Sequence, residues 1–437
     1  SLGKEIYCTD DTSVVTLGNG TESEGKMSPL NLQSTTITDE LKLATNFNGK
    51  VIGISLKDRG AILPAGHFAN WAFWYSKTGS FISSTFYGKE LPNWAMQFNN
   101  EKHYEKYANK KWELLKPKET YNESLTDNNP YEGKLFKKAP FFPYNLKEMY
   151  EANDAGILRS TPFGNNLIAD FAEAAIDNEQ LGQDNTTDFL ALSFSSTDYI
   201  GHVLGPPSIE LQDAYLRLDE TIADLLNYLD KKVGKNNYLV FLTADHAGAE
   251  NVTYLKDNKY DVDNINYKTF ENILRKFSED KFGVDLVLNN SNFNLFLDKK
   301  KVDEQNLELE DVIETFRAFL YEQKFIKRVY SEEEILENSG SDYYLNAIAK
   351  GYDPTQNGEL VYTFKPGYIE YSATGTSHGS PYTYDTHVPM LWYGWKIQKG
   401  ENYQKHVITE IAPTLALKLK ITLPNSTETE ALEEILK

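Results

Sequence analysis

The sequence predicts an α/β fold, with a mainly parallel sheet and helices on both of its faces. Helical patterns alternate with short apolar runs along the chain, which is typical of α/β domains. Hydrophobic residues make up 40% of the 437 residues, enough for a large core. Four of the apolar runs have the length and composition of buried strands, at 50–56, 188–194, 238–244 and 388–394.

Two helices are expected between these strands. Residues 166–176 have a helical apolar pattern just before the second strand. Residues 208–234 have Leu or Ile at three- to four-residue spacing between the second and third strands. Ser208 is a favourable N-cap for this helix, and Gly234 is a favourable residue to end it.

We expect a single domain over residues 1–437, with two insertions. Residues 86–160 are rich in Tyr, Asn and Pro and show little periodicity, which predicts a loop-rich insertion. Residues 265–345 show the pattern helix, strand, helix, strand, with one of the strands at 286–298. This second insertion is predicted to be a small α+β subdomain.

The acidic composition excludes several classes of partner. The formal net charge is −20, whereas nucleic-acid binding needs a positive surface, and an anionic membrane surface would repel the chain. No apolar run approaches the ~20 residues that a membrane-spanning helix needs. We therefore expect neither a nucleic-acid nor a membrane partner. Cys8 is the only cysteine, so no internal disulfide can form.

Charged and imidazole side chains follow three of the four predicted strands. Ligands of open α/β sheets bind outside the carboxyl ends of the strands, so these side chains are expected at one edge of the sheet. Two further histidines, His378 and His387, come just before the fourth strand. The strand-end residues are Lys57 and Arg59 after the first strand, Asp198 and His202 after the second, and Asp245 and His246 after the third.

Such a set of donors suits zinc or a similar divalent ion held for catalysis. It offers carboxylate oxygen and imidazole nitrogen but no thiolate, whereas closed structural zinc sites mostly use cysteine. Five protein ligands exceed what one catalytic zinc takes, so two ions are expected. Two metal ions can hold the attacking and leaving oxygens of a phosphoryl transfer, and Lys57 and Arg59 supply cations for the other phosphate oxygens.

Each of these features also has an ordinary structural explanation. An Asp followed four residues later by a His is most often a helix cap or a surface pair. Lys57 and Arg59 could pair with acidic residues, and His67 could be a core or loop residue bonded to backbone. His387 could be a packing residue beside the site. The case for a site therefore depends on several groups meeting at the same sheet edge.

Several segments together resemble the alkaline phosphatase superfamily. The likeness is greatest to the PafA-type phosphate-irrepressible alkaline phosphatases, which are monoesterases, and it covers essentially the whole chain. The C-terminal segment TEIAPTLALKLKITLPN also resembles the closing segment of that superfamily. The segments that carry the resemblance are ISLKDRGAILPAGH, SSTDYIGHVLGP, TADHAG and TGTSHGSPYTYDTHVPM.

The resemblance implies zinc-dependent hydrolysis of small phosphate monoesters by a periplasmic or secreted monomer. Two zinc ions are implied, and Lys57 and Arg59 would bind the phosphoryl oxygens. His387 falls outside the implied ligand set. The implied ligands are Asp198, His202 and His378 for the first zinc, and Asp245 and His246 for the second.

One part of the family pattern is not found in the sequence. The family has a first strand with a further aspartate ligand, followed by a threonine nucleophile that forms a phospho-threonine intermediate. Thr9, Asp10, Asp11 and Thr12 follow no buried strand, so they are poor candidates for these roles. We therefore expect that the N-terminal part of the fold lies outside this sequence. The chain alone is then expected to have little turnover and to expose an apolar sheet edge.

Two other functions stay open. A nucleotide pyrophosphatase or phosphodiesterase of the same superfamily uses the same zinc ligands. A non-catalytic protein on a degenerate phosphatase scaffold need not retain zinc. A sulfatase is less favoured, because Cys8 is followed by Thr and Asp and not by a Cys-x-Pro-x-Arg motif.

Overall fold

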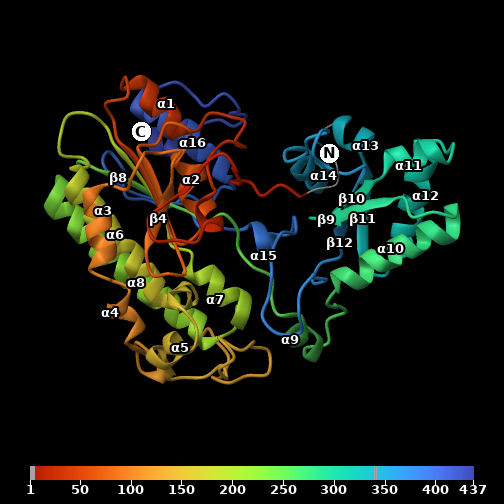
Figure 1. Ribbon diagram of the computed structural model, residues 1–437, viewed down its shortest axis with the longest axis horizontal. Helices are drawn as coiled ribbons and strands as arrows, with labels where there is room; N and C mark the ends of the chain where they lie inside the picture. Colours follow the sequence, from red (N-terminus) through yellow and green to blue (C-terminus); the bar gives the residue numbers. More distant parts are fainter. Residues whose placement is uncertain (1–4, 339, 341) are drawn as a thin grey trace.

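The computed structural model describes residues 5–338, 340 and 342–437, arranged in two lobes. The larger lobe contains the main sheet and most of the helices, and the smaller lobe contains a second sheet (Figure 1). The chain passes between the lobes near α9 (Val252–Asp257) and α15 (Thr383–Thr386) (Figure 1). No helix in the described ranges is both long and apolar enough to cross a membrane.

The main sheet has five strands and mixed direction. β2 is parallel to both β3 and β7, whereas β4 is antiparallel to β3 and β1. The predicted α/β class is confirmed, and the sheet is mixed because the turn at 76–80 folds β4 back on β3. The strand order is β1 (Thr16–Leu17), β4 (Phe81–Ser84), β3 (Trp71–Tyr75), β2 (Val51–Ser55) and β7 (Phe189–Ser193).

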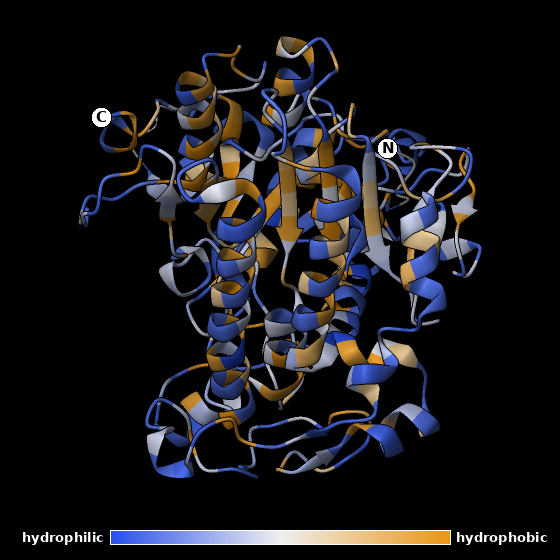
Figure 2. Ribbon diagram, turned by 90° about the vertical axis from the view of Figure 1, so that its left-hand side faces the viewer, coloured by the Kyte–Doolittle hydropathy of each residue, from blue (hydrophilic) through white to orange (hydrophobic). Residues whose placement is uncertain are grey.

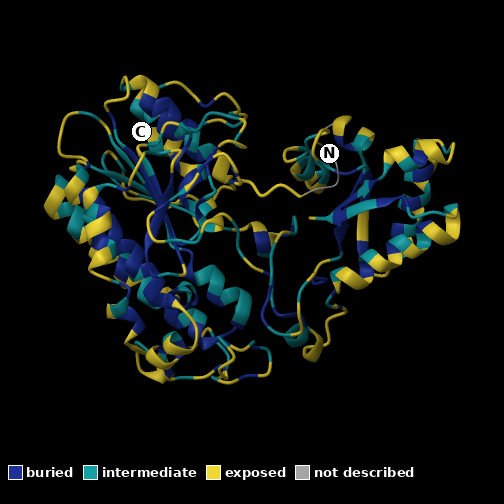
Figure 3. Ribbon diagram, viewed as in Figure 1, coloured by how far each residue is buried: buried dark blue, intermediate teal, exposed yellow. Residues whose placement is uncertain are grey.

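Side chains of β3 alternate between two cores, one on each face of the sheet. Phe73 and Tyr75 lie in the larger core, whereas Ala72 and Trp74 lie in a smaller core that also contains residues of α2 (Asp58–Ala65). Helix α6 (Pro162–Glu179) covers the first face. Strands β2, β3 and β4 are buried, whereas the helices carry buried and exposed residues, and hydrophobic and hydrophilic ones, along their length (Figures 2 and 3).

Both predicted helices are present. Residues 166–176 lie within α6, and the second helix is α8 (Ile209–Leu229), which continues as a π-helical turn at Asp230–Gly234. The Ser208 side chain caps α8 by accepting a hydrogen bond from the Leu211 amide at 3.3 Å. Gly234 ends the helical segment with a φ of 96°, which favours glycine.

The third and fourth predicted strands form a separate antiparallel pair. β8 (Leu239–Leu242) pairs with β13 (Leu391–Gly394), so the fourth strand is not part of a parallel sheet as predicted. In the described part of the chain, β7 pairs only with β2, and β8 pairs only with β13. Because both strands have an open edge, their side chains are largely half-buried, and the expectation of fully buried strands was wrong here. The rings of Phe189 and Phe241, one on each strand, lie 6.3 Å apart.

The second sheet has four antiparallel strands and its own hydrophobic core. Helices α10 (Tyr267–Phe282) and α12 (Leu309–Glu322) bury Leu274 and Phe316 in that core. Strand β11, at one edge of this sheet, pairs with β12. Because β12 lies beyond residue 345, the sheet extends past the 265–345 range expected for the insertion. The division of the chain into domains stays a prediction. The strand order is β11 (Ile326–Ser331), β12 (Leu360–Phe364), β10 (Asn294–Leu297) and β9 (Val287–Ser291).

Residues 286–298 form a hairpin and not the single strand that their apolar residues predict. Asn292 and Phe293 have φ values of 48° and 62°, the left-handed conformation of a two-residue hairpin turn. Asparagine adopts this conformation readily, but Phe293 does not, so the sequence gives only half of the usual turn signal.

The remaining elements are short. The 86–160 segment contains α3 (Asn93–Asn100), α4 (Glu105–Ala108), β5 (Lys111–Trp112), β6 (Tyr144–Asn145), α5 (Leu146–Ala152) and 3₁₀ turns at Lys118–Thr120 and Ala155–Ser160. The other elements are α1 (Ile37–Ala44), α7 (Ser196–Leu204), α11 (Lys299–Glu304), α13 (Glu332–Leu336), α14 (Tyr343–Ala349), α16 (Ile411–Leu419), α17 (Glu433–Leu436) and 3₁₀ turns at Ser23–Gly25 and Ile408–Glu410.

Candidate metal and phosphate site

Helix α7 begins directly after β7 and places Asp198 and His202 one turn apart on the same face. The Nε2 atom of His202 lies 3.2 Å from Oδ1 of Asp198. Its Nδ1 atom lies 2.9 Å from the carbonyl oxygen of Thr376, to which it can donate a hydrogen bond. This bond orients the ring with Nε2 toward Asp198, as is usual for a histidine that binds a metal.

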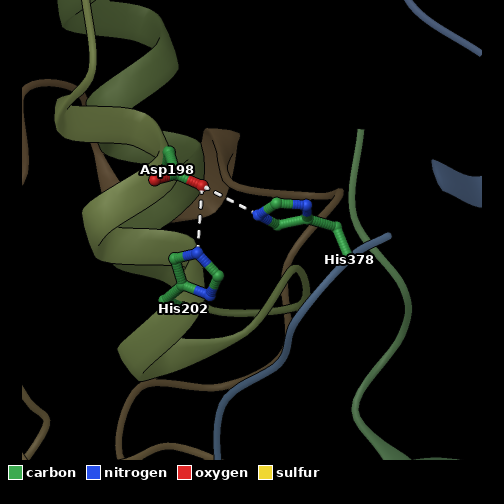
Figure 4. Close-up of side chains that lie close together, drawn as sticks. All are labelled: Asp198, His202 and His378. Carbon is green, nitrogen blue, oxygen red and sulfur yellow. Dashed lines mark ion pairs between the residues drawn. The ribbon is translucent and has the colours of Figure 1, made fainter. Parts of the chain in front are cut away.

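His378 joins this pair from the loop between β12 and α15. Its Nε2 atom lies 3.9 Å from Oδ1 of Asp198 (Figure 4). One ligand atom from each of Asp198, His202 and His378 lies within 4.8 Å of the others. Ligands that each lie about 2 Å from one zinc ion are roughly 3–4 Å from one another, so this spacing is close to that of a metal site.

His246 is a fourth donor in the same group. Its Nε2 atom lies 3.7 Å from the same oxygen of Asp198, and its ring stacks on that of His378 with centroids 3.4 Å apart. The Nδ1 atom of His246 lies 2.7 Å from the carbonyl oxygen of Ala247, so a backbone carbonyl orients this ring as well.

Asp245 lies at the margin of the group. Its side chain is 85% exposed, and its Oδ2 atom is 3.6 Å from Nε2 of His246. The structure thus brings four of the five predicted ligands together, while the ion pair of Asp245 is with His246.

The two predicted phosphate-binding cations, Lys57 and Arg59, flank Asp58 in the sequence. Lys57 is the N-cap residue of α2, and its Nζ atom forms an ion pair with Oδ2 of Asp198. Arg59 lies in the first turn of α2 and donates a hydrogen bond from Nη1 to the hydroxyl of Tyr7 at 2.9 Å. The Tyr7 hydroxyl in turn donates to Oδ1 of Asp58 at 2.8 Å. Lys57 therefore contacts the histidine group through Asp198, whereas Arg59 is held by Tyr7.

The electrostatics of the group favour an ionised Asp198 and a neutral His378. Burial acts to raise the pKa of Asp198, but hydrogen bonds from His202 and Lys57 outweigh it and lower this pKa well below its usual value. The bond to Asp198 raises the pKa of His202. Burial, with His246 and His202 nearby, lowers the pKa of His378 to about 4. Ionised carboxylate and neutral imidazole are the forms that bind metal ions.

Two of the histidines considered in the sequence, His387 and His67, lie outside the group. His387 is the exposed C-cap residue of α15. His67 lies 2.9 Å from the carbonyl oxygen of Leu32 and 2.9 Å from the carboxylate of Asp39, so its ordinary structural explanation applies.

Sequence reasoning missed Tyr7 and the two carbonyl groups that orient the histidines. Tyr7 is distant from Arg59 in the chain, and no local pattern marks it as a neighbour. Carbonyl groups of Thr376 and Ala247 have no sequence signal at all, because every residue has one.

Comparisons with known proteins give this group a family context. Residues 28–387 match the family model described as type I phosphodiesterase / nucleotide pyrophosphatase. The crystal structure of wild-type alkaline phosphatase PafA superposes with a TM-score of 0.95 at 43% identity, covering 100% of this chain and 84% of that one.

Three curated relatives align along the whole chain. Alkaline phosphatase PafA of Elizabethkingia meningoseptica is 43% identical, with 100% of this chain and 80% of that protein covered. Alkaline phosphatase PhoV of Synechococcus elongatus is 40% identical, with 100% and 79% covered. A protein of Myroides odoratus that is named a calcium-transporting ATPase is 42% identical, with 100% and 81% covered. The chain therefore belongs to the alkaline phosphatase superfamily and is similar to its PafA-type members.

Proposed function

We propose that this chain carries the metal and phosphate sites of a zinc-dependent phosphomonoesterase of the alkaline phosphatase type. The observation that carries the proposal is the approach of three imidazole nitrogens to a single carboxylate oxygen of Asp198, whose other oxygen pairs with Lys57. The names of two relatives that are at least 40% identical, both alkaline phosphatases, support the same reaction.

The donors in the site fit zinc. All are carboxylate oxygens or imidazole nitrogens, and backbone carbonyls orient two of the three rings. In the proposal Asp198, His202 and His378 hold a first ion, and Asp245 and His246 hold a second. When bound, zinc would act as a Lewis acid for the oxygens that enter and leave phosphorus.

Lys57 and Arg59 would bind the non-bridging oxygens of the phosphoryl group. Lys57 contributes a compact charge and Arg59 a planar pair of donors, and Tyr7 keeps the guanidinium in place. The proposed phospho-threonine intermediate also needs a threonine beside these cations, and we assign that role to no residue of this sequence. Low turnover by the chain alone stays a prediction.

The proposed substrates are small phosphate monoesters. The protein is proposed to act on them outside the cytoplasm. A phosphodiesterase is the second candidate, because the matching family model is described as a phosphodiesterase and nucleotide pyrophosphatase. Hydrolysis of a nitrophenyl phosphate by the zinc-loaded chain, compared with the matching bis-nitrophenyl diester, separates the two. A faster monoester reaction supports the proposal, and a faster diester reaction favours the second candidate.

Metal analysis separates both enzymes from a non-catalytic scaffold. A chain that retains zinc but turns over neither substrate fits an incomplete catalytic unit. A chain that neither retains zinc nor hydrolyses phosphate esters would contradict the proposal.

A further inference from the structure

Part of the loop-rich insertion folds over the junction of α7 and α8, outside the candidate site. The Leu125 amide donates to the carbonyl of Pro207 at 2.7 Å, and the Gly133 amide donates to that of Val203 at 2.8 Å. The carbonyl of Tyr131 accepts a hydrogen bond from Gly375 at 2.9 Å. Residues 125–133 therefore contact both the helix that carries His202 and the loop that leads to His378.

Two buried carboxylates lie within this contact. Glu210, in the first turn of α8, has no exposed surface, and Glu132 is 6% exposed. One oxygen of each has a partner, since Tyr144 donates to Oε1 of Glu210 at 2.6 Å and Asn129 donates to Oε1 of Glu132 at 2.6 Å. The Oε2 atoms of both are buried and have no hydrogen-bond partner among the described residues. Buried carboxylate oxygens rarely remain without a partner.

The charges of these residues are also uncompensated. Within the described ranges, neither Glu132 nor Glu210 forms an ion pair with a basic side chain, and the nearby carboxylate of Asp127 adds a third negative group. Burial, followed by the charge of Glu210, raises the pKa of Glu132 to about 8. Burial also raises the pKa of Glu210 to about 7. At alkaline pH both groups would ionise, and two ionised buried carboxylates need a counter-charge.

We propose that Glu132 and Glu210 bind a calcium ion between the insertion and α8, through their unpartnered Oε2 atoms. The available donors are all oxygens, which suits a hard cation such as calcium. Calcium also accepts neutral oxygens, and the Tyr144 hydroxyl lies beside Glu210. The ion would attach residues 125–133 to α8, next to the hydrogen bonds that join them to α7 and to the loop before His378, so it would stabilise the zinc site without joining it.

The test is a thermal unfolding experiment on the full chain with zinc held at a constant, saturating concentration. Calcium is first removed by passage over a chelating resin, zinc is restored, and calcium or magnesium chloride is then added. A calcium concentration far above its Kd should raise the midpoint by about 3 °C or more, because the ion binds only the folded chain. Metal analysis after gel filtration should find calcium in addition to zinc.

The Glu132→Gln and Glu210→Gln variants should lose the calcium response, whereas Glu119→Gln, an exposed residue of the same insertion, should keep it. Terbium serves as a second probe on the native chain, because Tyr144 beside the site can sensitise its luminescence and calcium should displace it. That measurement still decides the question if a variant fails to fold.

Three results would overturn the proposal. One is a native midpoint that does not respond to calcium, and another is an equal response in the Gln variants. The third is an absence of terbium luminescence that calcium displaces. In those cases the two carboxylates remain protonated in the folded chain, and the midpoint should instead fall as the pH rises from about 4.5 to about 8, whatever the calcium concentration.

Discussion

At the scale of single residues, the candidate site is organised around Asp198. One of its oxygens faces the Nε2 atoms of three histidines, and the other pairs with Lys57. Its carboxylate therefore connects the proposed metal ligands to the proposed phosphate-binding cation. Replacing Lys57 should consequently weaken the binding of the phosphoryl group. The rings of His202 and His246 should stay oriented, because the carbonyl groups of Thr376 and Ala247 hold them.

Replacing Lys57 or Arg59 by Ala should lower monoester turnover more than diester turnover. A monoester presents one more charged oxygen than a diester, so it loses more when a cation is removed. For each variant we expect a fall of about 10²-fold in kcat/KM for a nitrophenyl monoester. If turnover is too low to measure, calorimetry of inorganic phosphate binding to the zinc-loaded chain should show about tenfold weaker affinity.

Lys399→Ala is the matched control, because Lys399 is an exposed lysine of the C-terminal region. Equal losses for monoester and diester, or unchanged phosphate affinity, would contradict the role assigned to Lys57 and Arg59.

His67 should contribute a pH-dependent part of the stability. Burial acts to lower the pKa of His67, but its bonds to Asp39 and Leu32 outweigh this and raise the pKa. Both partners are acceptors, so only the doubly protonated ring can donate to both. A raised pKa means that the stabilisation is complete below the unfolded value of about 6.5 and is lost as the pH rises through the folded value.

The His67→Gln variant should therefore lose ~1 kcal/mol of unfolding free energy near pH 5.5 and clearly less near pH 9. Urea unfolding at both pH values measures this difference, with His103→Gln as the control. A loss of the same size at both pH values would show that the protonation of His67 is not coupled to folding.

At the scale of elements, local patterns predicted what local contacts determine. Helix α8 and its Ser208 cap follow from spacing and capping chemistry, both of which lie within a few residues of chain. The direction of β13 and the hairpin at Asn292 depend on which strands meet in space, and apolar composition alone does not specify that.

The same limit applies to the candidate site. The positions of Asp198 and His202 follow from helical spacing, whereas the exposure of Asp245 and the bond from Arg59 to Tyr7 depend on long-range packing.

Gly53 of β2 should not tolerate a larger side chain, because helix α2 packs directly against this strand. A Cβ atom at Gly53 would lie 2.0 Å from the carbonyl oxygen of Ala61 and 2.9 Å from Cβ of Ala65. Gly53→Ala must therefore displace α2, at a cost of ~2 kcal/mol or more in unfolding free energy. Urea unfolding should show this loss, whereas Gly400→Ala, with nothing within 4 Å of its Cβ, should change little. Equal stability of the two variants would show that α2 can shift without cost.

At the scale of the whole molecule, the proposed zinc site joins segments that are distant in the chain. Asp198 and His202 belong to α7 of the larger lobe, whereas His378 lies in the segment that returns from the second sheet (Figures 1 and 4). An ion bound by all three would therefore restrain how that returning segment packs against α7.

Zinc should consequently raise the unfolding midpoint of the chain. Ligand binding to the folded state alone predicts a rise of about 3 °C or more when zinc is far above its Kd, and a chelator should reverse it.

His378 and His387 make a matched pair for this test, since His378 lies within the group of ligands and His387 is exposed outside it. His378→Ala should lose most of the response to zinc, whereas His387→Ala should keep it. If His387→Ala abolished the response and His378→Ala did not, His387 would be the zinc ligand and His378 would not. A native midpoint indifferent to zinc would remove the metal from the proposed function, because Asp198 and the three imidazoles would then be a hydrogen-bonded cluster and not a site for an ion.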